Sequence, residues 1–196
     1  MSKTYNTGFK NFKYVISGGI STVPAPLPGA IKISFKPTTA SRTFRVRLSD
    51  GTMSSISKTI DAGKTAQLTI IDLPESFLKS VLGYVKASDG TLYEGQQTEV
   101  HFSLLYETQG ATEPTRHLLY DCVCVKPSYD ATTISAKPSI DTRTLDLLIS
   151  PSTKESTTAE KVYYGKYERT VKRSDNATLY DTWFGLLVPN TQQTQE

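Results

Sequence analysis

The feature that most constrains the fold of this chain is a repeated alternation of apolar and polar residues, which is the period of a half-buried β-strand. In residues 43–49, Phe44, Val46 and Leu48 alternate with Arg45 and Arg47. The same period recurs at residues 30–36, 66–71, 98–106 and 144–150. Residues 117–125 are apolar on both faces apart from His117 and Asp121, as in a central strand. Shorter or edge strands are expected at 161–171 and 182–187. We therefore predict a mainly β chain, arranged as a β-sandwich or small barrel with long loops.

Turn residues separate these segments. Asp50-Gly51 stands between two strand-like runs and predicts the tip of a hairpin. Residues 61–63 (Asp-Ala-Gly) and 88–90 (Ser-Asp-Gly) predict further turns. Pro24, Pro26 and Pro28 mark an extended, unpaired connection, because proline fixes φ and offers no N–H to a neighbouring strand.

One segment, from about Leu73 to Leu82, has the spacing of a helix instead. Its apolar residues fall on one face: Phe77, Leu78, Val81 and Leu82. Asp72 is placed to cap the start, Pro74 is tolerated in the first turn, and Gly83 supplies the stop. We predict one flanking helix here, packed on the sheet.

Polar stretches and the chain's length define the expected organisation. Residues 107–116 and 150–160 are too poor in apolar side chains to order themselves in isolation. We predict a single domain over residues 1–188 with an N-terminal arm, followed by a flexible tail at 189–196. Cys122 and Cys124 are separated by one residue, which would strain a disulfide, so both are expected to be free, buried strand residues.

Charge and motifs exclude several classes of function. The formal net charge of +3 is small and mixed along the chain, which does not indicate nucleic-acid binding. No apolar run is long enough for a membrane helix, and the N-terminus lacks the features of a secretory signal. His101 and His117 are the only histidines, and phosphate-loop, HExxH, paired CxxC and EF-hand patterns are missing. We therefore expect no enzyme activity, no cofactor and no metal.

Four local features, in order along the chain, resemble a known family. They are the Gly8–Tyr14 segment (Gly-Phe-Lys-Asn-Phe-Lys-Tyr), Gly29-Ala30-Ile31, the run from Ile71-Asp72-Leu73-Pro74 to Val81-Leu82-Gly83, and Tyr180-Asp181-Thr182-Trp183-Phe184. Together they resemble the major tail proteins of bacteriophages with long, non-contractile tails. The resemblance implies a tail-tube-like fold, in which six copies form a ring and the rings stack into a tube.

The resemblance also implies partners and contacts. DNA would pass through the tube without specific binding, and the other partners would be a tape-measure protein, a tail terminator and a baseplate or distal tail protein. The protein would be made in the bacterial host cytoplasm and reside in the virion. Edge strands would pair between subunits, residues 36–64 would form an inter-ring arm, and the N-terminal arm and C-terminal strand would clamp neighbours. The candidate contact residues are Phe9, Phe12, Tyr14, Arg42, Arg45, Arg47, Met53, Ile56, Trp183 and Phe184.

A conduit that bound phosphate in every ring would retain DNA. We therefore expect Arg42, Arg45 and Arg47 to face a subunit contact or to pair with carboxylates, not to line the channel unpaired. Two other readings of the chain remain open at this point. One is a ring-forming terminator or joining protein of the tail, and the other is a monomeric β-sandwich binding module, such as an adhesin or carbohydrate-binding domain.

Overall fold

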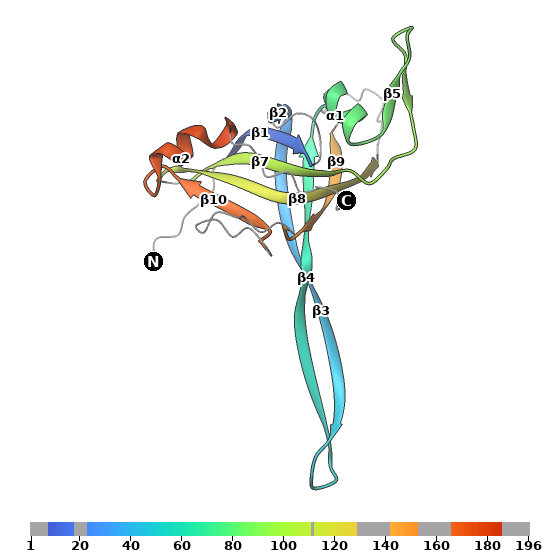
Figure 1. Cartoon of the computed structure of the whole chain (residues 1–196), viewed down its shortest axis with the longest axis vertical. Helices are drawn as coiled ribbons and strands as arrows, with labels where there is room; N and C mark the ends of the chain where they lie inside the picture. The colour runs from blue at the N-terminus through green and yellow to red at the C-terminus, as the bar shows by residue number, and fades with distance from the viewer. Residues whose placement is uncertain (1–7, 18–22, 111, 129–141, 153–165, 186–196) are drawn as a thin grey trace, which may run out of the picture.

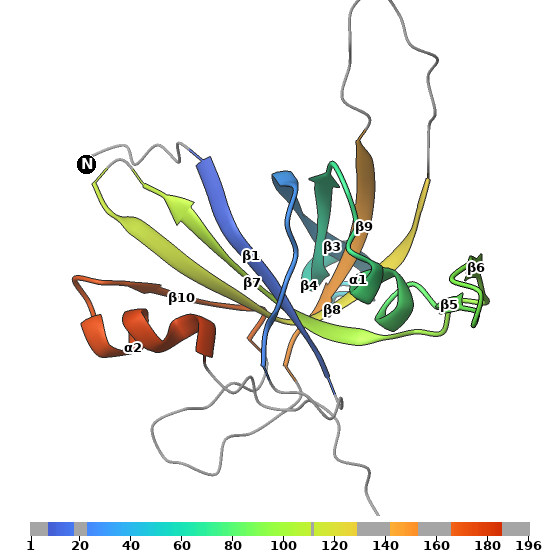
Figure 2. The same cartoon turned by 90° about the horizontal axis from the view of Figure 1, so that it is seen from above.

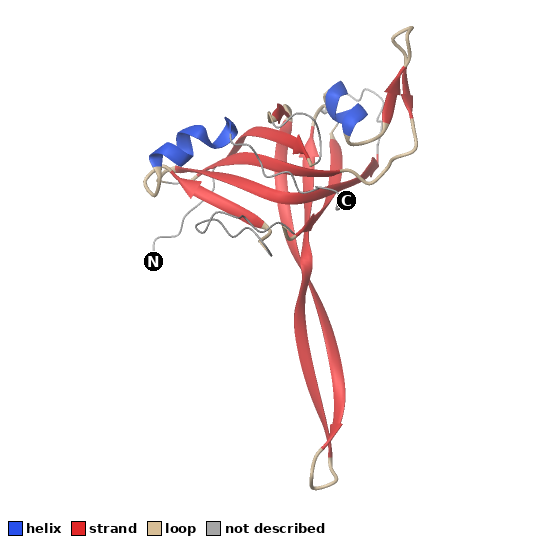
Figure 3. Cartoon of the chain, viewed as in Figure 1, coloured by secondary structure: helices blue, strands red, loops and turns tan. Residues whose placement is uncertain are grey.

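The computed structural model describes residues 8–17, 23–110, 112–128, 142–152 and 166–185, and the side chains at positions 40, 56, 58–62, 126 and 128 lie outside the described part. Its elements are β1 (Gly8–Ile16), β2 (Ala25–Pro26), β3 (Ala30–Arg47), β4 (Met53–Ile70), α1 (Glu75–Ser80), β5 (Tyr84–Lys86), β6 (Leu92–Glu94), β7 (His101–Gln109), β8 (Pro114–Ser128), β9 (Arg143–Ser150), β10 (Glu168–Lys172), α2 (Ala177–Thr182) and the 3₁₀ helix η1 (Trp183–Gly185). Strands dominate (Figure 3), so the prediction of a mainly β chain is confirmed.

One antiparallel sheet organises the described residues, with strand order β2-β1-β7-β8-β9-β4-β3 and β10 added beside β8. Strand β8 joins its two halves: β7 pairs along one edge, while β10 and then β9 pair along the other. Seen from above, β1, β7 and β10 cross the direction of β3, β4 and β9 (Figure 2). The sheet is therefore strongly curled around a core, and its order ends openly at β2 and β3.

The main core lies between the inner face of this sheet and α1. Phe77 of α1 is fully buried and packs edge-on against Tyr14 (ring centroids 4.9 Å apart) and Phe102 (5.8 Å). The alternating apolar residues of β4 and β9 complete the core: Ala66, Leu68, Ile70, Leu145, Leu147 and Ile149. Burial of this apolar surface is what holds the body together.

A smaller core lies on the opposite face of the sheet, beneath α2 and η1. Trp183 is fully buried there, against Leu105 and Leu118 among others. Successive residues of β7 can serve both cores because Leu104 faces one and Leu105 the other. The β7–β8 ladder shifts register between Phe102 and Leu104, where the Ser103 hydroxyl donates to the Tyr120 carbonyl (2.6 Å).

Helix α1 confirms the predicted helix but is shorter than expected. The predicted cap at Asp72 is wrong, since Pro74 occupies the N-cap position and no side chain caps the helix. Gly83 follows with φ of 75°, and a Cβ there would lie 2.8 Å from the Gln96 carbonyl oxygen. Glycine is thus required both by the backbone conformation and by the close approach of a second segment.

The edge strand predicted at residues 182–187 is wrong, because Ala177–Thr182 is helical and Trp183–Gly185 continues as a 3₁₀ turn. The Asn176 side chain accepts a hydrogen bond from the Leu179 N–H (2.9 Å), which caps the helix. Leu179, Tyr180 and Trp183 share one face at helical spacing and contact the smaller core. Residues 186 and 187 lie outside the described part.

Two predicted loops also differ. Residues 107–116 are mostly strand, since β7 runs to Gln109 and β8 starts at Pro114. The turn predicted at residues 61–63 is a bulge within β4, where Thr38 pairs with Gly63 but Thr39 pairs with Asp61. The stretches 150–160, beyond Ser152, and 189–196 lie outside the described residues. None of the helices in the described ranges is long and apolar enough to cross a membrane.

Candidate assembly interface

A two-stranded projection dominates the shape of the molecule. Strand β4 pairs with both β3 and β9 from Lys64 to Ile70. Beyond Lys64, toward the hairpin tip, β3 is its only partner among the described strands. We call residues 38–63 the arm; it begins at the bulge opposite Thr38 and extends away from the body (Figure 1). At ~3.3 Å per residue the arm spans on the order of 30 Å.

The arm forms because its sequence suits a hairpin. The predicted tip is confirmed: the Gly51 N–H donates to the Leu48 carbonyl (2.9 Å), and the Asp50 carboxylate accepts from the Thr52 N–H (2.9 Å) and hydroxyl (2.7 Å). Gly51 has φ of 85°, which explains glycine at this turn position. Along the ladder, a cross-strand hydrogen bond of 3.0 Å joins the hydroxyls of Thr43 and Ser57.

The arm has no core of its own. Every side chain from residue 41 to residue 53 is exposed, including Phe44 (51%), Leu48 (47%) and Met53 (64%). A two-stranded hairpin alone is only marginally stable in water. The large apolar side chains of the arm therefore gain little stability from packing within the described part of the chain.

The arm's two faces differ in chemistry. Because directly paired residues of an antiparallel ladder point to the same face, Arg42, Phe44 and Val46 share one face. Arg45, Arg47 and the paired Met53 share the other. Residues 38–63 contain four Lys or Arg and two Asp or Glu, a net formal charge of +4 − 2 = +2.

The sequence predicts that the three arginines of the arm either pair with carboxylates or face a contact between subunits. Arg42, Arg45 and Arg47 are exposed, and none forms an ion pair with a carboxylate among the described residues. Pairing within the chain is therefore excluded for the described carboxylates. That they face a contact between subunits stays a prediction. The same holds for Met53, while the side chain of Ile56 lies outside the described residues.

The arm's base is fixed to the body by a charged cluster. Lys64 is the residue of β4 directly after the arm, and its Nζ donates to Glu168 Oε2 of β10 (2.9 Å). Glu168 Oε1 accepts from His117 Nδ1 of β8 (2.8 Å) and from the Tyr106 hydroxyl (3.3 Å). The Tyr106 ring stacks on the His117 ring, with the two ring centroids 4.6 Å apart. Burial alone would raise the pKa of Glu168, but the hydrogen bonds from His117 and Lys64 outweigh it and lower that pKa to about 2. Glu168 is therefore ionised at neutral pH and ties β4, β8 and β10 together.

A second charged cluster fixes α2. Glu107 is almost fully buried and pairs with Lys10 (3.0 Å) and Arg116 (3.0 Å). Burial acts to raise the pKa of Glu107, and these two cations more than offset it, so the pKa is lowered. The Arg116 guanidinium also donates to the Tyr180 carbonyl and lies over the rings of Tyr180 (3.8 Å) and Phe184 (4.8 Å).

The aromatic contact candidates lie mostly inside the subunit. Phe12 and Tyr14 are buried in the main core, and Trp183 is fully buried in the smaller one. Phe9 also packs on the main core, because a bulge with Asn11 at φ of 57° turns both Phe9 and Phe12 toward Tyr106. Phe12, Tyr14 and Trp183 therefore stabilise the subunit itself. Phe9 and Phe184 are only partly buried, and that they contact a neighbouring subunit stays a prediction.

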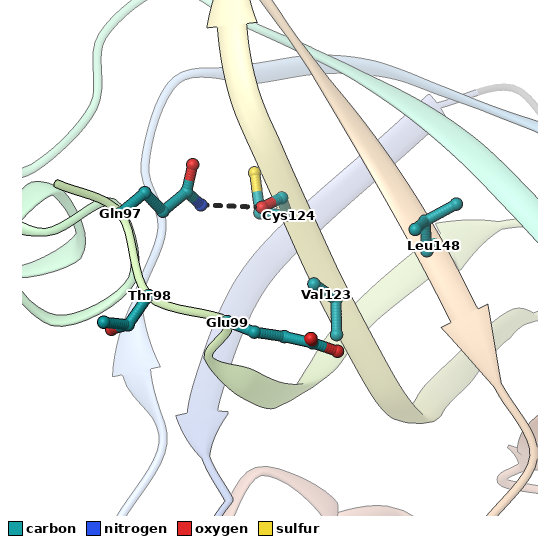
Figure 4. A pocket seen from close by; sticks show the side chains of 6 residues that line it. All are labelled: Gln97, Thr98, Glu99, Val123, Cys124 and Leu148. Atoms are coloured by element: carbon teal, nitrogen blue, oxygen red, sulfur yellow. Dashed lines mark hydrogen bonds between the residues drawn. The ribbon is translucent and has the colours of Figure 1, made fainter.

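A shallow groove of about 280 Å³ lies on the outer face of β8 and β9 (Figure 4). It is lined by Gln97, Thr98, Glu99, Val123, Cys124 and Leu148. The Gln97 side chain donates to the Cys124 carbonyl (2.8 Å) and so fixes the segment before β7 against β8. Cys122 and Cys124 are free and buried, as predicted, and burial raises the pKa of Cys124 to about 12. A thiol in that state is not a nucleophile at neutral pH.

The sequence did not point to this groove or to the cluster at the arm's base. Val123 and Leu148 look like ordinary strand residues, and only the pairing of β8 with β9 places them side by side. His117 and Glu168 are 51 positions apart in the chain. Within the described ranges, no three His, Cys, Asp or Glu side chains gather in a way that could hold a metal ion.

Comparison with known proteins finds similarity only among solved structures. No family model matches the sequence, and no curated protein is similar to it. Among solved structures, the chain is similar to a chain in the cryo-EM structure of the anti-feeding prophage (AFP) baseplate, 6-fold symmetrised, with 10% sequence identity and a TM-score of 0.47. The match covers 87% of this chain and 97% of that one. At this score the likeness says nothing about what the present chain does.

Proposed function

We propose that this chain is a structural subunit that assembles with copies of itself through the arm. The observation that carries the proposal is a ~30 Å hairpin with exposed apolar side chains on a well-packed body. In an isolated subunit these side chains lie in water and contribute nothing to stability. Contact with a neighbour would bury them and would add packing that the arm lacks by itself.

The free edge of β3 supports the same proposal. Strand β3 ends the sheet order, so its outer edge has no paired strand among the described residues over Ala30–Arg47. A long unpaired edge is a liability for a monomer and a template for pairing with another chain. In an assembly, a strand of the neighbour would complete this ladder.

The particular assembly we propose is the tail tube of a phage, on the resemblance to major tail proteins. Subunits would form hexameric rings, rings would stack through the arm, and DNA would pass through the lumen without specific binding. The protein would reside in the virion, beside a tape-measure protein, a terminator and a baseplate or distal tail protein. Its role would be structural, with no enzymatic step.

The test is self-assembly of the purified full-length chain across a concentration series, followed by sedimentation velocity and negative-stain electron microscopy. We expect stacked rings for the wild type and loss of assembly for the double variant Phe44→Asp, Val46→Asp. The matched control is Val85→Asp, because Val85 is even more exposed than Phe44 and Val46 but lies in the β5–β6 hairpin.

The possible outcomes separate the alternatives. Isolated rings without stacking would favour a terminator or joining protein. Equal assembly of wild type and arm variant would contradict a role for the arm. A monomer at every concentration would contradict self-assembly, and a glycan-binding screen would then test the binding-module alternative.

A further inference from the structure

Among the described residues, the outer face of β8 and β9 carries an apolar strip that no helix or strand covers. Val123 pairs directly with Leu148, and Val125 with Asp146, so these side chains share one face. Val125 is 49% exposed and Leu148 is 50% exposed. Helix α2 covers the outer face only over the part of the sheet that holds Leu105, Leu118 and Val171.

Carboxylates border this strip. The Glu99 side chain is 71% exposed, and His101 Nε2 lies 3.4 Å from its Oε1. His101 Nδ1 in turn lies 2.7 Å from Asp121 Oδ1, so this histidine stands between two acidic groups. At the other end of the strip, exposed Asp146 accepts a hydrogen bond from Gln67 (2.9 Å). The strip therefore combines apolar side chains with negative charge at both ends.

The arm has the complementary chemistry. One of its faces carries Phe44 and Val46 with Arg42 beside them, and Arg45 and Arg47 extend from the other face. Long arginine side chains can lie along apolar surface while their charged ends reach a carboxylate at its border. Apolar contact would then be combined with charge pairing of fixed orientation.

We propose that the strip of Val123, Val125 and Leu148, with Glu99 and Asp146 at its border, is the site that receives the arm of a second copy of this chain. The inference rests on the proposed function, since it names where the arm of an assembled neighbour binds. The arm cannot fill the strip of its own chain, because it leaves the body at Lys64 and points away from it (Figure 1). A second copy of this chain can present the same arm to the strip.

The strip is a poor site for other occupants. The groove over part of the strip is shallow, and the carboxylates at the border of the strip would repel nucleic acid. Its cysteine is buried and holds its proton at neutral pH, so covalent chemistry is not indicated. A cationic, apolar protein segment is what this combination of side chains favours, and the arm is such a segment.

Charge reversal in the full-length chain tests the proposal. The arm variant is Arg42→Glu with Arg45→Glu, and the strip variant is Glu99→Lys with Asp146→Lys. All four side chains are exposed, so each monomer is expected to keep its circular dichroism spectrum and melting temperature. Each double variant alone should need at least a tenfold higher concentration for half-assembly, and the chain carrying all four changes should recover most of this loss. Asp175→Lys, an exposed carboxylate before α2, is the matched control and should assemble as wild type does.

The outcomes distinguish the two proposals. If the arm variant fails to assemble but the strip variant assembles like wild type, the strip is not the receiving site, while the proposed function stands. If the strip variant fails and the fourfold variant does not recover, direct pairing between arm and strip is overturned. If the wild type stays monomeric, or the arm variant assembles as well as wild type, the proposed function itself falls and the arm has no such site.

Discussion

The arm and the body are built from the same two strands but differ in what covers them. In the body, Ile33 of β3 and Leu68 and Ile70 of β4 alternate with polar residues and are buried against α1 and the rest of the sheet. In the arm, Phe44 and Val46 of β3 alternate in the same way and remain exposed. The alternation of apolar and polar residues is the same in the arm and in the body. Only in the body does the described part of the chain supply a second layer that covers the apolar face.

This difference shows what an alternating pattern measures. It indicates that one face of a strand will be covered, but it does not say whether the covering layer belongs to the same chain. Where the chain supplies the layer, the apolar residues stabilise the fold. Where it does not, the same residues indicate association, and they should affect assembly rather than folding.

The largest expected effect lies in the body, at Phe77. Replacement by Ala removes a fully buried ring that contacts Tyr14 and Phe102, and should lower the free energy of unfolding by about 3–5 kcal/mol. Urea denaturation followed by circular dichroism measures this. If the free energy of unfolding fell no more than it does on replacing an exposed arm residue, burial would not distinguish the body from the arm.

The next effect lies where the arm meets the body, at Glu168. Replacement by Gln removes the charge that Lys64 and His117 contact, and should cost on the order of 2 kcal/mol, since hydrogen bonds to charged groups are the stronger ones. The same urea titration measures it. Exchange of Glu113→Gln, at a surface carboxylate that contacts Ser174, is the control and should cost clearly less. Equal losses would mean that the cluster at the arm's base has no special role.

The Glu168 carboxylate also predicts how the stability of the fold depends on pH. The pKa of Glu168 is lowered from 4.5 to about 2 in the folded chain, so the unfolded chain takes up this proton first as the pH falls. Its contribution to stability is therefore present above pH 4.5 and is lost between about pH 4.5 and pH 2. Melting temperatures across this range should fall less steeply for Glu168→Gln than for wild type. If the melting temperatures of wild type and Glu168→Gln fell in parallel with pH, the Glu168 carboxylate would not be the group that loses its stabilising contacts in acid.

Sequence reasoning went furthest where structure is local. The alternating segments, the Asp50-Gly51 tip and the helix near Phe77 are set by neighbouring residues, and all three are present. The arm as a continuous hairpin was harder to see, because residues 36–42 are polar and include Pro37. Their strand conformation comes from the ladder with β4, not from a pattern of their own.

The sequence does not show which aromatic side chains lie in the core of the subunit, for a physical reason. An aromatic residue such as Phe12 or Trp183 suits a core and an interface equally, and its location depends on distant partners. A one-residue bulge at Asn11 turns Phe9 and Phe12 to the same side, and Asn176 starts a helix that buries Trp183. Neither the bulge nor the helix can be predicted from the alternation of apolar and polar residues. The groove on β8 and β9 also required the pairing of two strands that the sequence alone does not specify.

The smallest expected effect on stability completes the comparison, at Phe44. Replacement by Ala should change the free energy of unfolding of the monomer by less than about 0.5 kcal/mol, because the ring is exposed and contacts no core. The same change should raise the concentration needed for assembly severalfold, since the ring becomes buried only against a neighbour. Urea denaturation at a concentration where the wild type is monomeric gives the first quantity, and sedimentation velocity gives the second. A loss of stability comparable to that of Phe77→Ala, without any effect on assembly, would mean that the arm folds back onto its own body in solution and that its exposed face has a partner within the same chain.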